Sequence, residues 1–148
     1  MAALFSEDKE LASSLKIEAC GAPGVQPAAP DESWQRVSLA LRSGKRSLDE
    51  LCLVCRQPED ELRKLVELAG DLAERRRETI LFEPAEPSFE LVLERTREGG
   101  IKVEAWIDAG NADTGFYRWD AAGIRFFTTE AELRLFIEAL GKEFLTSA

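Results

Sequence analysis

FELVLERTREGGIKVEAWIDAG, residues 89–110, is the stretch that decides the fold class. On each side of Glu98-Gly99-Gly100, every second residue is apolar. A repeat of two places alternate side chains on opposite faces of a strand, and glycines supply the backbone freedom of a tight turn. The stretch therefore predicts an antiparallel hairpin with strands at 89–97 and 101–109, whose inward side chains are Phe89, Leu91, Leu93, Ile101, Val103, Ala105 and Ile107.

Segments on both sides of this hairpin carry similar alternation or short apolar runs, and we expect them to be strands as well. They are SSLKIEAC at 13–20, WQRVSLALRSG at 34–44, SLDELCLVC at 47–55, TILFEP at 79–84, TGFYRWD at 114–120 and GIRFF at 123–127. Asp49 and Glu50 leave the start of the strand at 47–55 undecided. A Pro- and Gly-rich loop is expected at 21–33. Residues 1–12 are polar and mixed, so we expect a flexible tail before one domain that spans 13–148.

Two segments have helical periodicity. Pro58 followed by acidic residues is typical of a first helical turn, and the apolar stripe that follows, closed by AERRRE, predicts a helix over about 58–76. Thr129 and Glu132 have the spacing of a capping box, and a stripe through Phe136 and Leu140 predicts a helix over about 130–145. Hairpin-linked strands with two segregated helices predict an α+β fold: a mostly antiparallel sheet with both helices packed on it.

The composition limits the classes of function. The chain has 148 residues and a formal net charge of −9. This charge disfavours nucleic-acid binding and suits a basic protein partner. The three arginines at 75–77 are interpreted as cations at a helix C-terminus. The sequence has no apolar run long enough to cross a membrane and no signal-peptide pattern at its N-terminus, so we expect a cytoplasmic protein that does not associate with membranes.

The residue types of common catalytic and metal sites are missing or sparse. Without histidine there is no His-based triad, and the usual iron and catalytic zinc sites are disfavoured. The cysteines are Cys20, Cys52 and Cys55, and the last two lie in an apolar run interpreted as a strand, where residues three apart point to opposite faces. We therefore expect unbridged thiols without a bound metal, and no cofactor.

WIDAGNADTGFYRWDAAGIRFF, residues 106–127, is rich in aromatic and acidic side chains and has several interpretations. A calcium loop is disfavoured, because DAGNAD does not match the EF-hand pattern and lacks the distant glutamate. Asp108, Asp113 and Asp120 would act as catalytic carboxylates only if they converged in a cleft. The aromatic residues either complete the core under the helices or form a contact face. For a contact face, the candidate partner-binding residues are Trp106, Asp108, Asp113, Tyr117 and Trp119.

The order of these features resembles that of the WapI-type bacterial immunity proteins, a family that neutralises toxins deployed between competing cells. The similarity covers residues of about 14–145 and rests on SSLKIEA, WQRVSLAL, LCLVC before a helix, LFEPAEPSFEL, IKVEAWIDAG and the terminal LRLFIEALGKEF. It implies a cytoplasmic, non-enzymatic protein that binds a cognate toxin, which the acidic charge leads us to expect to be basic. Two alternatives stay open: a small enzyme with Asp or Glu as acid and base, and a structural or ligand-binding module.

Overall fold

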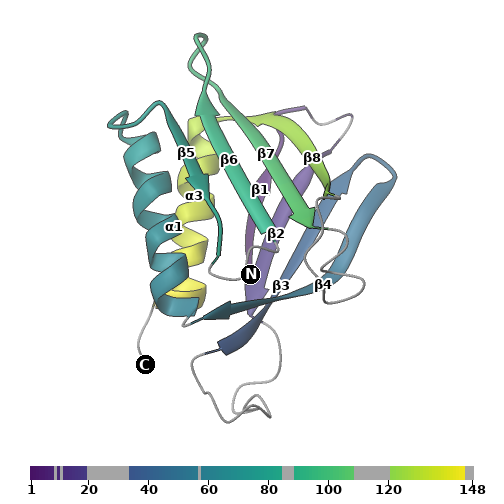
Figure 1. The fold of residues 1–148 in the computed structure, drawn as a ribbon. Coiled ribbons are helices and arrows are strands. Elements are labelled where there is room, and N and C mark those ends of the chain that lie inside the picture. The colour runs from purple at the N-terminus through teal and green to yellow at the C-terminus, as the bar shows by residue number, and fades with distance from the viewer. Residues whose placement is uncertain are drawn as a thin grey trace.

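The fold was obtained as a computed structural model, which describes residues 1–8, 10, 12–19, 34–56, 58–84, 89–108 and 121–145. The chain consists of two consecutive groups of elements, and each group has four strands followed by a helix (Figure 1). In chain order the elements are β1 (Ala2–Phe5), β2 (Ser14–Ala19), β3 (Trp34–Ser43), β4 (Arg46–Arg56), α1 (Pro58–Ala73), β5 (Thr79–Phe82), β6 (Phe89–Arg95), β7 (Ile101–Asp108), β8 (Ala121–Thr128), α3 (Glu130–Leu140) and the π-helical turn η1 (Gly141–Leu145).

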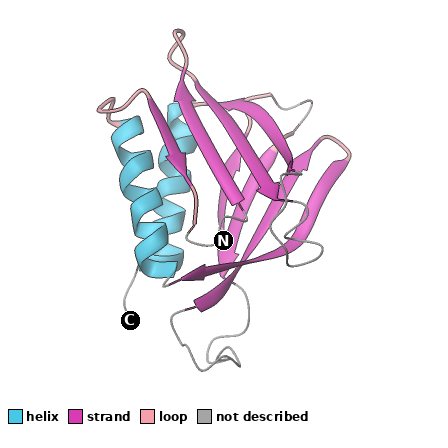
Figure 2. Cartoon of the chain, in the orientation of Figure 1, coloured by secondary structure: helices cyan, strands magenta, loops and turns pink. Residues whose placement is uncertain are grey.

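The strands form two antiparallel sheets, which confirms the α+β fold class but not the expectation of a single sheet. One sheet has the order β1-β2-β3-β4 and the other the order β5-β6-β7-β8. Within each sheet, every strand therefore pairs with its neighbours in sequence, as hairpin connections require. Helix α1 interrupts this series after β4, and β5 then starts a second sheet instead of pairing with the first. Figure 2 shows the two groups of strands on one side of the helix pair.

The hairpin of β6 and β7 is confirmed as predicted. The two strands pair antiparallel from Phe89 opposite Ile107 to Arg95 opposite Ile101. Gly99 adopts a φ of 89°, a conformation that side chains with a Cβ rarely adopt. The turn is closed by the Thr96 amide, which donates to the Gly100 carbonyl over 2.9 Å. The inward residues of both strands are buried, as the alternation required.

The expectation of a flexible tail over residues 1–12 was wrong. Ala2–Phe5 form β1, which pairs antiparallel with β2 from Ala2 opposite Ile17 to Phe5 opposite Ser14. Ala2 and Leu4 are fully buried and α3 packs along this strand. The alternating signal is only four residues long and is followed by polar residues, so the sequence pattern alone did not distinguish it from a tail.

The first helix is shorter than the sequence pattern suggested, whereas the helical run of α3 and η1 ends at Leu145, close to the predicted bound. Helix α1 ends at Ala73, because Arg75 takes a left-handed conformation with a φ of 63° and the Arg76 amide donates back to the Asp71 carbonyl over 2.8 Å. The three arginines at 75–77 therefore follow the helix. Helix α3 begins as predicted, with Thr129 as its N-cap, and widens into η1 after Leu140.

One hydrophobic core joins both sheets to both helices. It contains inward residues of β1–β3 and β5–β8, and Leu48 of β4 packs against it. The helices contribute Leu62, Leu65, Ala69, Leu72 and Ala73 of α1 and Leu133, Phe136 and Leu140 of α3. In Figure 1 the helices lie side by side, β1 and β2 lie behind β6 and β7, and β3 and β4 extend below them and to the right. The sheets are also linked by hydrogen bonds, since the Glu7 amide donates to the Phe127 carbonyl over 2.9 Å. The face of β5–β8 turned to the viewer is therefore the face away from the core.

Strand β4 contains an irregularity at the two acidic residues that made its start uncertain. Leu39 of β3 lies opposite Leu51, whereas Leu41 lies opposite Leu48, so the register shifts between these two pairs. An extra residue in one strand is a β-bulge, and it accommodates Asp49 and Glu50 without ending the strand. The expectation that residues 47–55 are a strand is therefore confirmed. The side chains of Cys52 and Cys55 lie outside the described part of the structure, and their unbridged, metal-free state stays a prediction.

Candidate functional site

The outward face of β5–β8 is the candidate functional site, and we call it the outer sheet face. The pairing register places the strands side by side in rows, so that Leu81, Val92, Glu104 and Arg125 lie in line across the sheet. The inward residues of β5–β7 are buried, as is Phe126 of β8, while Ala122 and Ile124 of β8 are partly buried. The outward residues of the four strands are partly or fully exposed. The face consists of Thr79, Leu81, Glu90, Val92, Glu94, Lys102, Glu104, Trp106, Gly123, Arg125 and Phe127.

Large apolar side chains are exposed on this face. Leu81 is 56% exposed and Phe127 is 53% exposed, while Val92 and Trp106 are partly exposed. Leu81 and Val92 are direct cross-strand neighbours, and Trp106 lies diagonally beyond Val92. Figure 1 shows no helix in front of β6 and β7. The described part of the fold therefore leaves this mixture of apolar and charged side chains open.

Trp106 is held in place by a glycine on the neighbouring strand. Gly123 lies opposite Trp106, and a Cβ added at Gly123 would stand 2.7 Å from Cε3 of the indole. The same Cβ would collide with the carbonyl oxygen of Ala105. Close approach of this kind is a common reason for a glycine inside a strand. The indole therefore packs closely against Gly123 of β8 and occupies a defined position on the outer sheet face.

The charges of the outer sheet face are only partly paired. Lys102 lies 2.9 Å from the Glu94 carboxylate, and this hydrogen-bonded partner raises the pKa of the lysine. Glu104 adds a weaker attraction to the same lysine. Among the described residues, no ion pair involves Glu90, Glu104 or Arg125. The region around Trp106 therefore has two carboxylates, Glu90 and Glu104, that form no ion pair with any described residue, and Glu90 lies directly opposite Trp106.

The structure places two of the five residues predicted for partner binding. Trp106 lies on the outer sheet face as its alternation indicated, and Asp108 is the last residue of β7, opposite Ala121. Asp113, Tyr117 and Trp119 lie outside the described residues, as does Asp120. Leu81 and Phe127 were not among the residues predicted for partner binding. Alternation within TILF and GIRFF would have placed both opposite the inward Ile80, Phe82 and Phe126.

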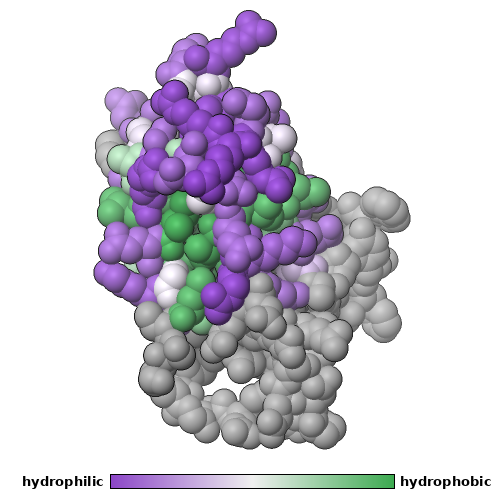
Figure 3. Space-filling view, turned by 90° about the vertical axis from the view of Figure 1, so that its left-hand side faces the viewer, coloured by the Kyte–Doolittle hydropathy of each residue, from purple (hydrophilic) through white to green (hydrophobic). Residues whose placement is uncertain are grey.

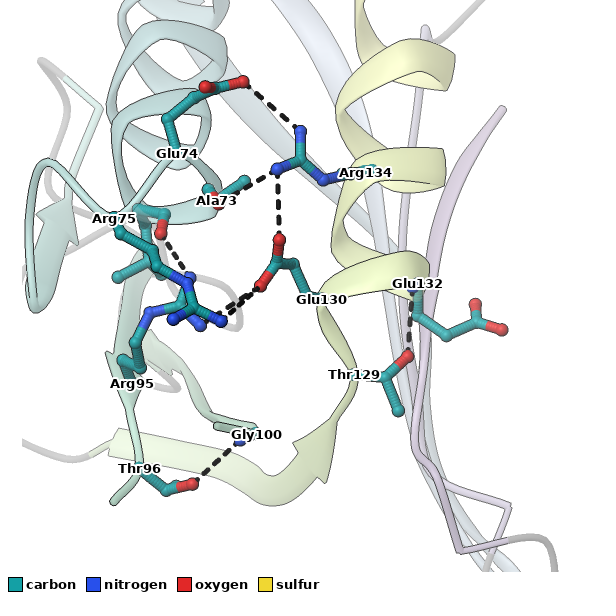
Figure 4. A network of polar contacts seen from close by, with 11 residues as sticks. Ala73, Glu74, Arg75, Arg95, Thr96, Gly100, Thr129, Glu130, Glu132 and Arg134 are labelled. Carbon is teal, nitrogen blue, oxygen red and sulfur yellow. Dashed lines mark hydrogen bonds and ion pairs between the residues drawn. The ribbon is translucent and has the colours of Figure 1, made fainter. Parts of the chain in front are cut away.

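A second polar cluster joins the end of α1 to the start of α3 (Figure 4). Arg95, whose side chain is only 7% exposed, donates from Nη2 to the Leu72 carbonyl over 2.6 Å and lies 3.3 Å from the Glu130 carboxylate. Arg134 donates to the Ala73 carbonyl and to Glu130, each over 3.1 Å. Cations at a helix C-terminus and carboxylates at a helix N-terminus both complement the helix dipole. These bonds lower the pKa of Glu130, with Arg134 as the largest cause. We assign this cluster a structural role.

The remaining hollows and side-chain groups do not form a recognisable site. One small hollow between the sheets is lined by apolar residues alone, namely Ile17, Val37, Leu39, Leu62, Phe82, Pro84 and Phe89. In the part of the chain that the structure describes, no three Cys, Asp or Glu side chains stand close enough to hold a metal ion. None of the described helices has the length and apolar character needed to cross a membrane. Seen from the side of the helices, the described surface is mostly hydrophilic with apolar residues between (Figure 3).

Comparisons with protein-family models, with curated proteins and with solved structures found no match to this chain. The resemblance to the WapI-type immunity proteins therefore stays a prediction from the sequence pattern.

Proposed function

We propose that the protein is a non-enzymatic binding protein that uses the outer sheet face to hold a basic protein partner. The observation that carries the proposal is the exposure of Leu81 and Phe127 beside the partly exposed Trp106, on a sheet face that no described helix covers. Aromatic and apolar anchors surrounded by charged residues are typical of protein–protein contacts. The net charge of −9 supports a partner of opposite sign.

The resemblance in sequence pattern supports a more specific class for this partner. A WapI-type immunity protein acts in the cytoplasm and neutralises a cognate toxin by binding it, so we propose a basic toxin domain as the partner. Asp108 at the end of β7, together with Asp113, Tyr117 and Trp119, belongs to the proposed contact surface from its place in the sequence. Neutralisation by occlusion requires no catalytic group of this chain.

The decisive experiment measures binding of a candidate toxin domain, encoded beside the gene for this protein, to variants of matched surface residues. Leu81→Asp removes an apolar contact on the outer sheet face. Leu135→Asp is the control, because Leu135 is 59% exposed on α3, close to the 56% of Leu81. We expect Leu81→Asp to weaken binding at least about tenfold and Leu135→Asp to leave it nearly unchanged. An equal loss of affinity in both variants, or no loss in either, would place the contact elsewhere.

The salt dependence of the same complex tests the proposed sign of the partner. If charge steers the encounter, association should slow markedly as salt is added, because screening shortens the reach of the acidic surface. Dissociation should change less, because contacts in the complex are partly shielded from solvent. Trp106→Ala should instead raise the dissociation rate if the indole is an anchor. An association rate that is indifferent to salt would contradict a basic partner.

A further inference from the structure

The indole of Trp106 has a defined position on the outer sheet face. The indole covers Gly123 on one side, and the side chain is still partly exposed. The ring therefore has a surface that a partner side chain can reach, and the contact with β8 fixes its orientation. An aromatic ring fixed in this way loses little conformational entropy on binding.

The charges next to the ring favour a cation. Glu90 lies directly opposite Trp106 on β6, and Glu104 precedes it by two residues on the same face of β7. Neither carboxylate forms an ion pair with a described residue, whereas Glu94 is already occupied by Lys102. Arg125 lies opposite Glu104 on β8 and repels a cation that approaches from that strand. The side of the ring toward Glu90 is therefore the favourable one.

We propose that this position receives an arginine side chain of the basic partner, stacked on the Trp106 indole and paired with the Glu90 carboxylate. The inference rests on the proposed binding function and adds the chemistry of one contact to it. A guanidinium is planar and weakly hydrated, so it stacks on an indole and keeps its hydrogen bonds to a carboxylate in the same plane. A lysine ammonium is more strongly hydrated and forms only point contacts. The position therefore prefers arginine to lysine.

The test uses peptides of equal charge as probes. Hexa-arginine and hexa-lysine are titrated at low salt into the isotope-labelled full chain, and backbone and indole N–H signals are followed by NMR. The signal of Trp106 is identified by its loss in Trp106→Leu. We expect hexa-arginine to bind several-fold more tightly than hexa-lysine, and to shift the signals of Glu90, Trp106 and Gly123 most.

Two kinds of variant separate this position from the general acidity of the protein. Glu90→Gln with Glu104→Gln should weaken hexa-arginine binding about threefold to tenfold, because the partly exposed ion pair with Glu90 is lost together with the attraction of the nearby Glu104. Glu67→Gln with Glu98→Gln makes the same charge change at exposed residues of α1 and of the hairpin turn, and should have little effect. Trp106→Leu should weaken binding about threefold to tenfold, and Trp106→Phe should restore most of it, because the aromatic face is kept.

The outcomes overturn the inference independently of the proposed function. Equal affinities for the two peptides, or equal losses from the two glutamate pairs, would mean that only net charge is sensed. Trp106→Phe behaving like Trp106→Leu would exclude stacking. If a toxin domain loses binding to Leu81→Asp but binds Glu90→Gln and Trp106→Leu normally, the binding function stands and the arginine position does not. If the toxin domain binds Leu81→Asp as tightly as the unaltered protein while hexa-arginine still binds at Trp106, the proposed function is wrong and the arginine position stands.

Discussion

Replacing Arg95 by methionine should destabilise the protein by about 2 kcal/mol, because the guanidinium links the end of α1 to the start of α3. The Nη2 bond to the Leu72 carbonyl, at 2.6 Å, joins a nearly buried cation to a helix terminus, and a hydrogen bond of a charged group contributes about 1.5–3 kcal/mol. The pair with Glu130 adds little, since that carboxylate is 30% exposed and keeps Arg134. Leu72 also keeps the Arg75 amide as a donor. Nε of Arg95 is buried without a hydrogen-bond partner among the described residues, and its removal offsets part of the loss.

Methionine keeps the apolar stem, so that the substitution tests the charged group more than the packing. Urea unfolding followed by tryptophan fluorescence gives the free energy, and thermal unfolding should show a midpoint lowered by about 4–8 °C for a chain of this size. Arg97→Met is the matched control, because Arg97 lies two residues further on in the exposed hairpin turn and should change stability by less than about 0.5 kcal/mol. A loss for Arg95→Met no larger than that of the control would refute a structural role for the cluster.

Three further substitutions test the core, the sheet and the pH dependence. Phe136→Ala removes a fully buried ring of α3 and should lower the free energy of unfolding in urea by about 3–5 kcal/mol. Phe127→Ala removes a ring that is 53% exposed and should lower it far less. Similar values for the two variants would mean that α3 is not docked. Gly123→Ala should destabilise the protein by about 1–3 kcal/mol, because the added Cβ meets the Ala105 carbonyl and the Trp106 ring. Gly70→Ala is the control, since Gly70 has open space around it in α1 and the change should be neutral or stabilising. Unchanged stability of Gly123→Ala would contradict the packing of the indole. Because folding lowers the pKa of Glu130 below 4.5, the carboxylate stabilises the fold above that pH and loses this effect as the pH falls through the folded value. The deficit of Glu130→Gln measured at pH 7 should therefore disappear in acid, and a deficit that persists there would exclude the ion pairs as its cause.

Local sequence patterns were enough to predict most of the individual elements. Alternation on either side of Gly99 determined the β6–β7 hairpin, because a residue shift in pairing would turn every apolar side chain outward. The Thr129 cap determined where α3 begins, since its hydroxyl accepts from the Glu132 amide over 3.1 Å. The same alternation placed Trp106 on the outward side of its strand. These signals are carried by residues within a few positions of one another.

The tertiary structure decided what depends on contacts between distant segments. Four residues cannot form a stable strand alone, and β1 exists because β2 pairs with it and α3 buries Ala2 and Leu4. The division into two sheets depends on whether β5 pairs with an earlier strand, which no local pattern encodes. Exposure of Leu81 and Phe127 likewise depends on which sheet face the helices cover, and Arg95 is buried only because the ends of α1 and α3 meet beside it. Periodicity reports the two faces of an element, whereas the choice of the buried face is made by the free energy of packing the whole chain into one core.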